Sequence, residues 1–245
     1  VERRFVGLEQ LRRVANDIRD FGTGRLRLAV LPAAASGLVP AALRSFVDRF
    51  PEVTIALHVR PSGTVYEWVS SGHCDLGLAA PRTGFAGVEE TMLLDLPGVV
   101  AMPKGHRLAR LRRALTPADL AGETFLAQGL EDPSRTVTDA AFRAAGINPR
   151  IRLETPYGGT LCSLVATGLG VALVNPLVAE DHATLAIAFR PFRPRITFRS
   201  YLLLQRGAVP DRLTVAFAEI LREEAQARAA RLGEREPQVR QAMRR

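Results

Sequence analysis

Two short stretches place small or hydroxyl-bearing residues directly before a predicted helix. One occupies residues 62–64 and the other residues 158–160, and their members are Ser62, Gly63 and Thr64, and Gly158, Gly159 and Thr160. Backbone N–H groups at a helix start have no acceptor within the helix, so they can bind a small anionic group, and a hydroxyl adds a further donor. The alternative for the hydroxyls of residues 62–64 is simple helix capping.

A third candidate set, Asp132, Ser134 and Arg135, lies at another predicted helix start. The Asp132 carboxylate can accept hydrogen bonds from an ammonium group, and the Arg135 guanidinium can hold a carboxylate through two parallel bonds. The alternative interpretation is an N-cap aspartate beside a surface arginine. Both interpretations stay open on the sequence alone.

A fourth candidate set lies in a predicted loop at residues 32–37, directly after the first predicted strand. Its small residues, Ala33 among them, let a ligand approach the backbone, and Ser36 can offer a hydroxyl. Ser36 is equally suited to cap the helix that follows.

The sequence gives no reason to expect catalysis, a metal or a cofactor. It contains no nucleophile elbow, phosphate-binding loop or dinucleotide motif. The four histidines, residues 58, 73, 106 and 182, lack the paired spacing of metal ligands. Cys74 and Cys162 are far apart in apolar contexts, which predicts two buried free thiols. We therefore expect a binding protein and not an enzyme.

Composition indicates a globular protein, with 47% hydrophobic and 24% charged residues among 245. The net charge of +8 suits a polyanionic partner, but an Arg-rich composition with solvated helix faces explains it equally well. No apolar run is long enough to span a membrane, and the N-terminus does not resemble a secretory signal. We expect a cytoplasmic protein with no membrane partner.

The elements that must position these candidates alternate between strands and helices in two successive parts. The first part has predicted strands at 25–31, 53–59 and 74–79 and helices at 38–50 and 65–71. The second has strands at 125–128, 151–154 and 171–174 and helices at 132–145 and 161–167. Helices between strands are typical of a parallel, doubly wound sheet. Ligands of such sheets bind at the carboxyl ends of the strands.

Later segments complete the prediction. They are strands at 185–189 and 196–205 and a helix at 213–228. The chain is expected to cross from one lobe to the other near residues 97–98 and to return near 194–198. An amphipathic helix is predicted at residues 1–21, with apolar residues at helical spacing.

The order and spacing of several motifs resemble the effector-binding domain of LysR-type transcriptional regulators over residues 25–222. The motifs are RLRLAVLPAAASGLVPAAL, FVDRFPEVTIAL, EWVSSGHCDLGLA, MPKGHRLA, LTPADLAGETFLA and LVATGLGVALVNP. The resemblance implies an α/β fold of two Rossmann-like lobes joined by a two-strand hinge, a type 2 periplasmic-binding-protein-like fold preceded by a linker helix. It also implies a small-molecule effector in the inter-lobe cleft, where a hydroxyl near Ser62 contacts the effector carboxylate.

The implied organisation has four parts. Residues 1–23 are the C-terminal part of a linker helix, residues 25–97 and 197–228 form effector-binding lobe I, residues 98–196 form lobe II, and residues 229–245 are a charged C-terminal tail. The winged helix-turn-helix of the family is missing from the chain, so DNA is expected as a partner only through that missing domain. A homodimer or homotetramer is implied as well.

The stretch VNPLVAEDHATLAIAFRPFRPRITFRSYLL resembles the LysR/opine-sensing subgroup of the family. This resemblance implies an amino-acid-like effector, such as diaminopimelate, lysine or an opine. Two alternatives remain: a solute-binding protein for amino-acid transport, and an enzyme on the same two-lobe scaffold. An upstream helix-turn-helix would favour the regulator, and a signal peptide would favour transport.

Overall fold

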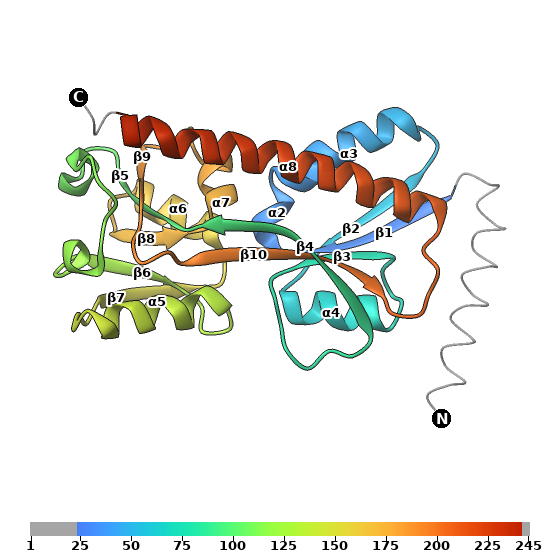
Figure 1. The fold of residues 1–245 in the computed structure, drawn as a ribbon, viewed down its shortest axis with the longest axis horizontal. Coiled ribbons are helices and arrows are strands. Elements are labelled where there is room, and N and C mark those ends of the chain that lie inside the picture. Colours follow the sequence, from blue (N-terminus) through green and yellow to red (C-terminus); the bar gives the residue numbers. More distant parts are fainter. Residues whose placement is uncertain (1–23, 242–245) are drawn as a thin grey trace. The chain divides into compact units, whose positions relative to one another are not determined.

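The computed structural model describes the backbone of residues 24–241 (Figure 1). The predicted linker helix at residues 1–23 therefore lies outside the described residues, as do residues 242–245. Within 24–241, no helix combines the length and the apolar character needed to cross a membrane.

The chain divides into two compact units. The described parts of unit 1 are residues 24–31, Val39–Leu93 and Tyr201–Glu224, and unit 2 comprises Pro32–Leu38, Leu94–Ser200 and residues 225–241. The divisions at residues 93/94 and 200/201 fall inside two long strands, β4 (Val88–Pro97) and β10 (Thr197–Gln205).

Unit 1 is built on a mixed sheet with the strand order β2-β1-β3-β10-β4. Strands β1 (Arg25–Val30), β2 (Thr54–Val59) and β3 (Leu76–Ala79) are parallel, whereas β10 runs antiparallel to β3. Along β1, Leu26 and Leu28 are fully buried, whereas the alternating Arg27 forms an ion pair with Asp75 at 2.5 Å. The alternation of apolar and charged residues thus fixes which face of β1 enters the core.

The helices of unit 1 are α3 (Leu38–Arg49), α4 (Ser62–Ser70) and the first part of α8 (Arg212–Gln241). Helix α4 packs through Val65, Tyr66 and Val69 against a buried cluster that contains residues of β1, β3 and β10 (Figure 1). Phe46 of α3 and Phe217 of α8 meet edge to face, with ring centroids 5.4 Å apart.

Unit 2 has a second mixed sheet, in the order β7-β6-β8-β5-β9. The strands are β5 (Val99–Pro103), β6 (Thr124–Gln128), β7 (Arg150–Thr155), β8 (Val171–Val174) and β9 (Ile187–Pro191). Strands β6, β7 and β8 are parallel, and β5 is antiparallel to both β8 and β9.

Two apolar clusters cover the two faces of this sheet. Helix α5 (Pro133–Ala144) contributes Phe142 to one cluster, and α6 (Gly158–Ala166) and α7 (Pro176–Asp181) contribute to the other (Figure 1). Neighbouring residues of one strand, such as Leu126 and Ala127 of β6, belong to opposite clusters, as the two-residue period of a strand requires.

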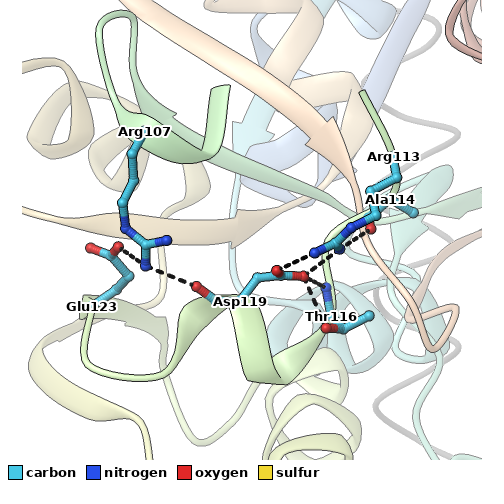
Figure 2. Close-up of polar contacts among 6 residues, drawn as sticks. All are labelled: Arg107, Arg113, Ala114, Thr116, Asp119 and Glu123. Atoms are coloured by element: carbon cyan, nitrogen blue, oxygen red, sulfur yellow. Dashed lines mark hydrogen bonds and ion pairs between the residues drawn. The ribbon is translucent and has the colours of Figure 1, made fainter. Parts of the chain in front are cut away.

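Two short 3₁₀ helices, η1 (Arg107–Arg110) and η2 (Pro117–Leu120), lie in unit 2. The Asp119 carboxylate accepts hydrogen bonds from the backbone N–H and the hydroxyl of Thr116, at 2.8 and 2.9 Å, and pairs with Arg113 (Figure 2). Glu123 pairs with Arg107 at 2.6 Å. Thr116 is the N-cap of η2, and Pro117 is its first helical residue.

The α/β class and most predicted elements are confirmed, but several details of the sequence prediction are wrong. The sheets are mixed and not wholly parallel, because β10 runs antiparallel to β3 in unit 1 and β5 runs antiparallel to β8 and β9 in unit 2. The predicted loop at 32–37 contains a helical turn, α2 (Pro32–Ala35), and α7 was not predicted. Residues 62–64 and 158–160 are the first turns of α4 and α6, not loops before them.

Helix α8 extends beyond its predicted end at residue 228 and continues through Gln241. Its sequence from 222 to 232 is rich in Ala, Arg and Glu, which favour helix.

Candidate functional site

The start of α4 presents backbone donors at the carboxyl end of the sheet of unit 1. Pro61 is the N-cap with extended dihedral angles (φ −56°, ψ 149°), and the first helical bond runs from Val65 N to Pro61 O at 3.1 Å. The N–H groups of Ser62, Gly63 and Thr64 therefore have no acceptor within the helix. No side chain caps this helix; instead, the Ser62 hydroxyl accepts a 3.0 Å bond from the N–H of Ala80.

Arg82 lies beside this helix start and was not identified from the sequence. A Cβ atom added to Gly63 would lie 3.2 Å from Nη1 of Arg82, so the missing side chain leaves room for the guanidinium. The Arg82 residue is exposed. One signal could have found it: Arg82 follows β3, and the carboxyl ends of the parallel strands β1, β2 and β3 lie at one edge of the sheet.

Ala33 and Ser36 belong to unit 2, in which α2 packs against α6 and α7. Ala33 is partly buried against the apolar cluster of those helices, and Ser36 is exposed in the turn before α3. The next residue, Gly37, has no room for a side chain, since an added Cβ would lie 2.0 Å from an Asp181 carboxylate oxygen.

Asp132, Ser134 and Arg135 all lie at the start of α5, where Asp132 is the N-cap. The Asp132 carboxylate accepts bonds from the backbone N–H of Ser134 at 2.8 Å and from its hydroxyl at 2.7 Å. Ser134 is only 4% exposed. The capping interpretation thus describes what Asp132 does in the structure.

The Arg135 side chain is 7% exposed, so it is not a surface arginine. It pairs with Asp139 and Glu154, each at 2.9 Å, and donates a 2.8 Å bond to the backbone carbonyl of Gln128. Burial lowers the pKa of Arg135, but the bonds to Glu154 and Asp139 outweigh burial and raise it. The charge of Arg135 is therefore already neutralised by two carboxylates of unit 2, and its side chain holds the end of β6.

The start of α6 is a second set of backbone donors. Leu161 N donates to Tyr157 O at 3.1 Å, so the N–H groups of Gly158, Gly159 and Thr160 have no acceptor within the helix. The two glycines also let α7 approach closely: added Cβ atoms would lie 3.3 Å from Val178 and 3.1 Å from the His182 ring. The same two glycines thus allow close packing of α7 and expose backbone N–H donors.

Groups suited to metal binding are not assembled in residues 24–233, whose side chains the structure describes. There, no three His, Cys, Asp or Glu side chains are grouped as a metal site requires. Both cysteines are buried, as predicted, and burial raises the pKa of the Cys162 thiol to about 12. A thiol of that pKa is not a nucleophile at neutral pH.

Sequence comparison places the chain among regulators. Residues 19–226 match the model of the LysR substrate binding domain. The chain is 32% identical to the transcriptional activator protein LysR of Escherichia coli over 218 residues, which cover 89% of this chain and 70% of that protein. It is 37% identical to the octopine catabolism/uptake operon regulatory protein OccR of Rhizobium meliloti over 195 residues, which cover 78% and 63% of the two chains.

Solved structures share the fold. The effector-binding domain of BenM with benzoate superposes with a TM-score of 0.71 at 18% identity and covers 84% of this chain and 94% of that one. CbnR, a LysR family transcriptional regulator, gives a TM-score of 0.69 at 20% identity, with 90% and 77% covered.

These matches confirm the predicted type 2 periplasmic-binding-protein-like fold and the expectation that the chain is not an enzyme. The α4 and α6 helix starts are therefore elements of a ligand-sensing domain. The chain belongs to the LysR substrate binding domain family, the effector-binding part of LysR-type transcriptional regulators.

Proposed function

We propose that this domain controls transcription by binding an amino-acid-like effector of the diaminopimelate, lysine or opine class. The observation that carries the effector class is the 37% identity to a regulator named for octopine catabolism and uptake. The 32% identity to the E. coli LysR activator supports the same assignment. An effector that binds one state of the domain better than another shifts its conformational equilibrium, and so changes how attached DNA-binding segments are presented.

In unit 1, the first turn of α4 is the proposed carboxylate site. Its free N–H groups, at Ser62, Gly63 and Thr64, are donors without a competing capping side chain. The Arg82 guanidinium beside Gly63 adds a positive charge and two parallel donors. In unit 2, Gly158, Gly159 and Thr160 remain proposed ligand-binding residues, whereas Asp132, Ser134 and Arg135 are better assigned to the support of that unit.

Calorimetric titration of the chain tests the effector class. The ligands are diaminopimelate, L-lysine and octopine, with benzoate as a carboxylate that lacks an amino group. Saturable heat from at least one amino-acid ligand, and a raised melting temperature in its presence, is the expected result. Absence of binding by all three would contradict the effector class. Saturable heat from benzoate alone would replace the class with an aromatic acid.

DNA binding is proposed to reside in a winged helix-turn-helix outside these 245 residues, since the chain spans 70% of the E. coli relative. The proposed assembly is a homo-oligomer. Two edge strands and the helices that precede them carry exposed apolar residues. In unit 1 these are Leu57 and Val59 of β2 and Val47 of α3. In unit 2 they are Ile151 of β7 and Val137 of α5. A second copy of the chain would cover these edges.

Sedimentation of the purified chain tests this assembly. Leu57→Lys and Ile151→Lys should each weaken dimerisation at least tenfold, because a lysine would be desolvated in the interface. Val209→Lys is the control, since Val209 is 95% exposed and lies on neither edge. A wild-type monomer at high concentration would contradict the proposed dimer.

A further inference from the structure

The last residue of β6, Gln128, places an unpaired polar side chain in the interior of unit 2. The residue is 7% exposed, and its side-chain oxygen Oε1 is buried without a hydrogen-bond partner among the described residues. Buried polar atoms are nearly always paired, so an unpaired one needs an explanation. A methionine or leucine would fill the same space without this cost.

The backbone around Gln128 is held firmly. Gln128 is paired in register with Thr155 of β7, and its carbonyl accepts the 2.8 Å bond from the buried Arg135. Arg135 in turn is fixed by Asp139 and Glu154. The side chain of Gln128 is thus presented from a rigid strand end, and the surrounding bonds all satisfy the backbone and leave the side-chain oxygen unmatched.

The Gln128 amide lies at the start of α6. Its Nε2 atom is 3.6 Å from the position of a Cβ added to Gly158, the first residue of that helix. The free N–H groups of Gly158, Gly159 and Thr160 supply donors only, and the helix start favours a negative charge. The unmatched Oε1 supplies the opposite function, an acceptor. One site therefore offers donors for an anion next to a single acceptor for an N–H group.

We propose that Gln128 recognises the α-amino group of the effector while the first turn of α6 binds the adjacent carboxylate. In an α-amino acid, or an N-substituted one, the amino nitrogen and the carboxylate are attached to the same carbon, which suits an acceptor placed beside a donor cluster. The proposal rests on the proposed amino-acid effector and names the group by which unit 2 distinguishes such a ligand from other carboxylates.

The test compares Gln128→Met with wild type in the full chain. Calorimetry measures L-lysine and meso-diaminopimelate, and 6-aminohexanoate serves as the lysine analogue without an α-amino group. In wild type, 6-aminohexanoate should bind at least tenfold more weakly than L-lysine. In Gln128→Met, binding of the amino acids should weaken at least tenfold, and affinity for 6-aminohexanoate should stay within twofold of wild type.

A melting-temperature measurement separates this role from a structural one. Removal of an unpaired acceptor should leave the melting temperature of ligand-free Gln128→Met unchanged or raised. Gln205→Met is the matched control: the Gln205 amide donates a 3.0 Å bond to Ser70 O in unit 1, so this variant should melt lower and bind normally.

Three results would overturn the proposal. One is a Gln128→Met variant that binds the amino acids as wild type does. Another is a variant that melts lower and loses affinity for 6-aminohexanoate equally, which would assign Gln128 a structural role. The third is a wild-type chain that binds neither amino acid nor octopine, which would contradict the proposed function and this inference together. A Gln128→Met variant with wild-type affinity for the amino acids would contradict this inference alone.

Discussion

The starts of α4 and α6 have nearly the same sequence, Ser-Gly-Thr and Gly-Gly-Thr, yet their surroundings differ. At α4, the neighbouring side chain is the exposed cation of Arg82. At α6, the neighbours are the buried neutral amide of Gln128, the apolar Val178 and the His182 ring. Identical backbone donors are therefore completed by a charge in one unit and by a neutral acceptor in the other.

This difference shows that a helix start determines only the sign of the charge that a bound group should carry. In the proposed sites, the exposed charge at α4 would attract carboxylates without discriminating between them. The buried amide at α6 would discriminate by hydrogen-bond pattern, because an unmatched partner is costly only where water is excluded. We therefore expect substitutions around α4 to change affinity for carboxylates generally, and those around α6 to change selectivity or stability.

The largest effect is expected from Arg135→Ala, which removes the support of Gln128. Loss of the buried cation removes the ion-pair partner that Asp139 and Glu154 share, and should lower the free energy of unfolding by about 2–4 kcal/mol. Urea unfolding followed by circular dichroism measures this. Arg143→Ala, a surface substitution at the other end of α5, is the control. An unfolding free energy within 0.5 kcal/mol of wild type, a span of about the size expected for surface changes, would contradict the supporting role.

Arg82→Ala should weaken carboxylate binding at α4 by about 1–2 kcal/mol and leave stability unchanged, because Arg82 is exposed and adds a charged donor. Affinities for meso-diaminopimelate and octopine, each of which has a second carboxylate, should fall. L-lysine has a single carboxylate, which the start of α6 is proposed to bind, so its affinity should stay within twofold of wild type. Arg206→Ala, an exposed arginine in the turn after β10, is the control. If Arg82→Ala changed only the affinity for L-lysine, the contrast between the two helix starts would be wrong.

Alanine at the two glycine positions gives a smaller contrast. Gly159→Ala would bring a Cβ within 3.1 Å of the His182 ring, which is held by a 2.8 Å bond between Nδ1 and Val178 O, so stability should fall by about 1 kcal/mol. Gly63→Ala meets only the mobile end of Arg82 and should be nearly neutral. Thermal unfolding measures both, and equal melting temperatures for the two variants would show that α7 does not require the glycine.

The smallest effect concerns Asp119, away from both helix starts. The hydrogen bond from Arg113 holds the pKa of Asp119 well below its usual range (Figure 2). Because the folded pKa lies below the unfolded one, the contribution to stability is complete above about pH 4 and is lost as pH falls through the folded value. Asp119→Asn should therefore show a shallower decline of melting temperature between pH 5 and pH 2. Parallel declines would contradict this.

Local signals in the sequence predicted much of the fold. Asp132 before Pro133 marks a helix start, and the structure confirms Asp132 as the N-cap of α5. The Val171–Val174 strand is confirmed with the predicted bounds, since a short apolar run between glycine and Asn-Pro suits a buried strand. These features depend on residues within a few positions of one another, so the sequence alone contains the information.

Helix α7 and the helical turn α2 were missed because they are short and Pro-led, and their apolar residues are too few to show a helical period. Tertiary packing decides them: α2 and α7 lie against each other and against α6. The parallel arrangement was overestimated for a related reason, since β5 and β10 pair with strands distant in sequence.

The sequence by itself determined the family, the two alternating α/β units and the two helix starts with free N–H groups, because motif order and capping residues are local properties of the chain. Only the tertiary structure decided which side chains lie beside the starts of α4 and α6. Arg82 reaches Gly63, and Gln128 reaches Gly158, through the meeting of strand ends and helices that are 19 and 30 positions apart. It also turned Arg135 from a candidate ligand group into the support of Gln128, because burial and two carboxylates are properties of the fold.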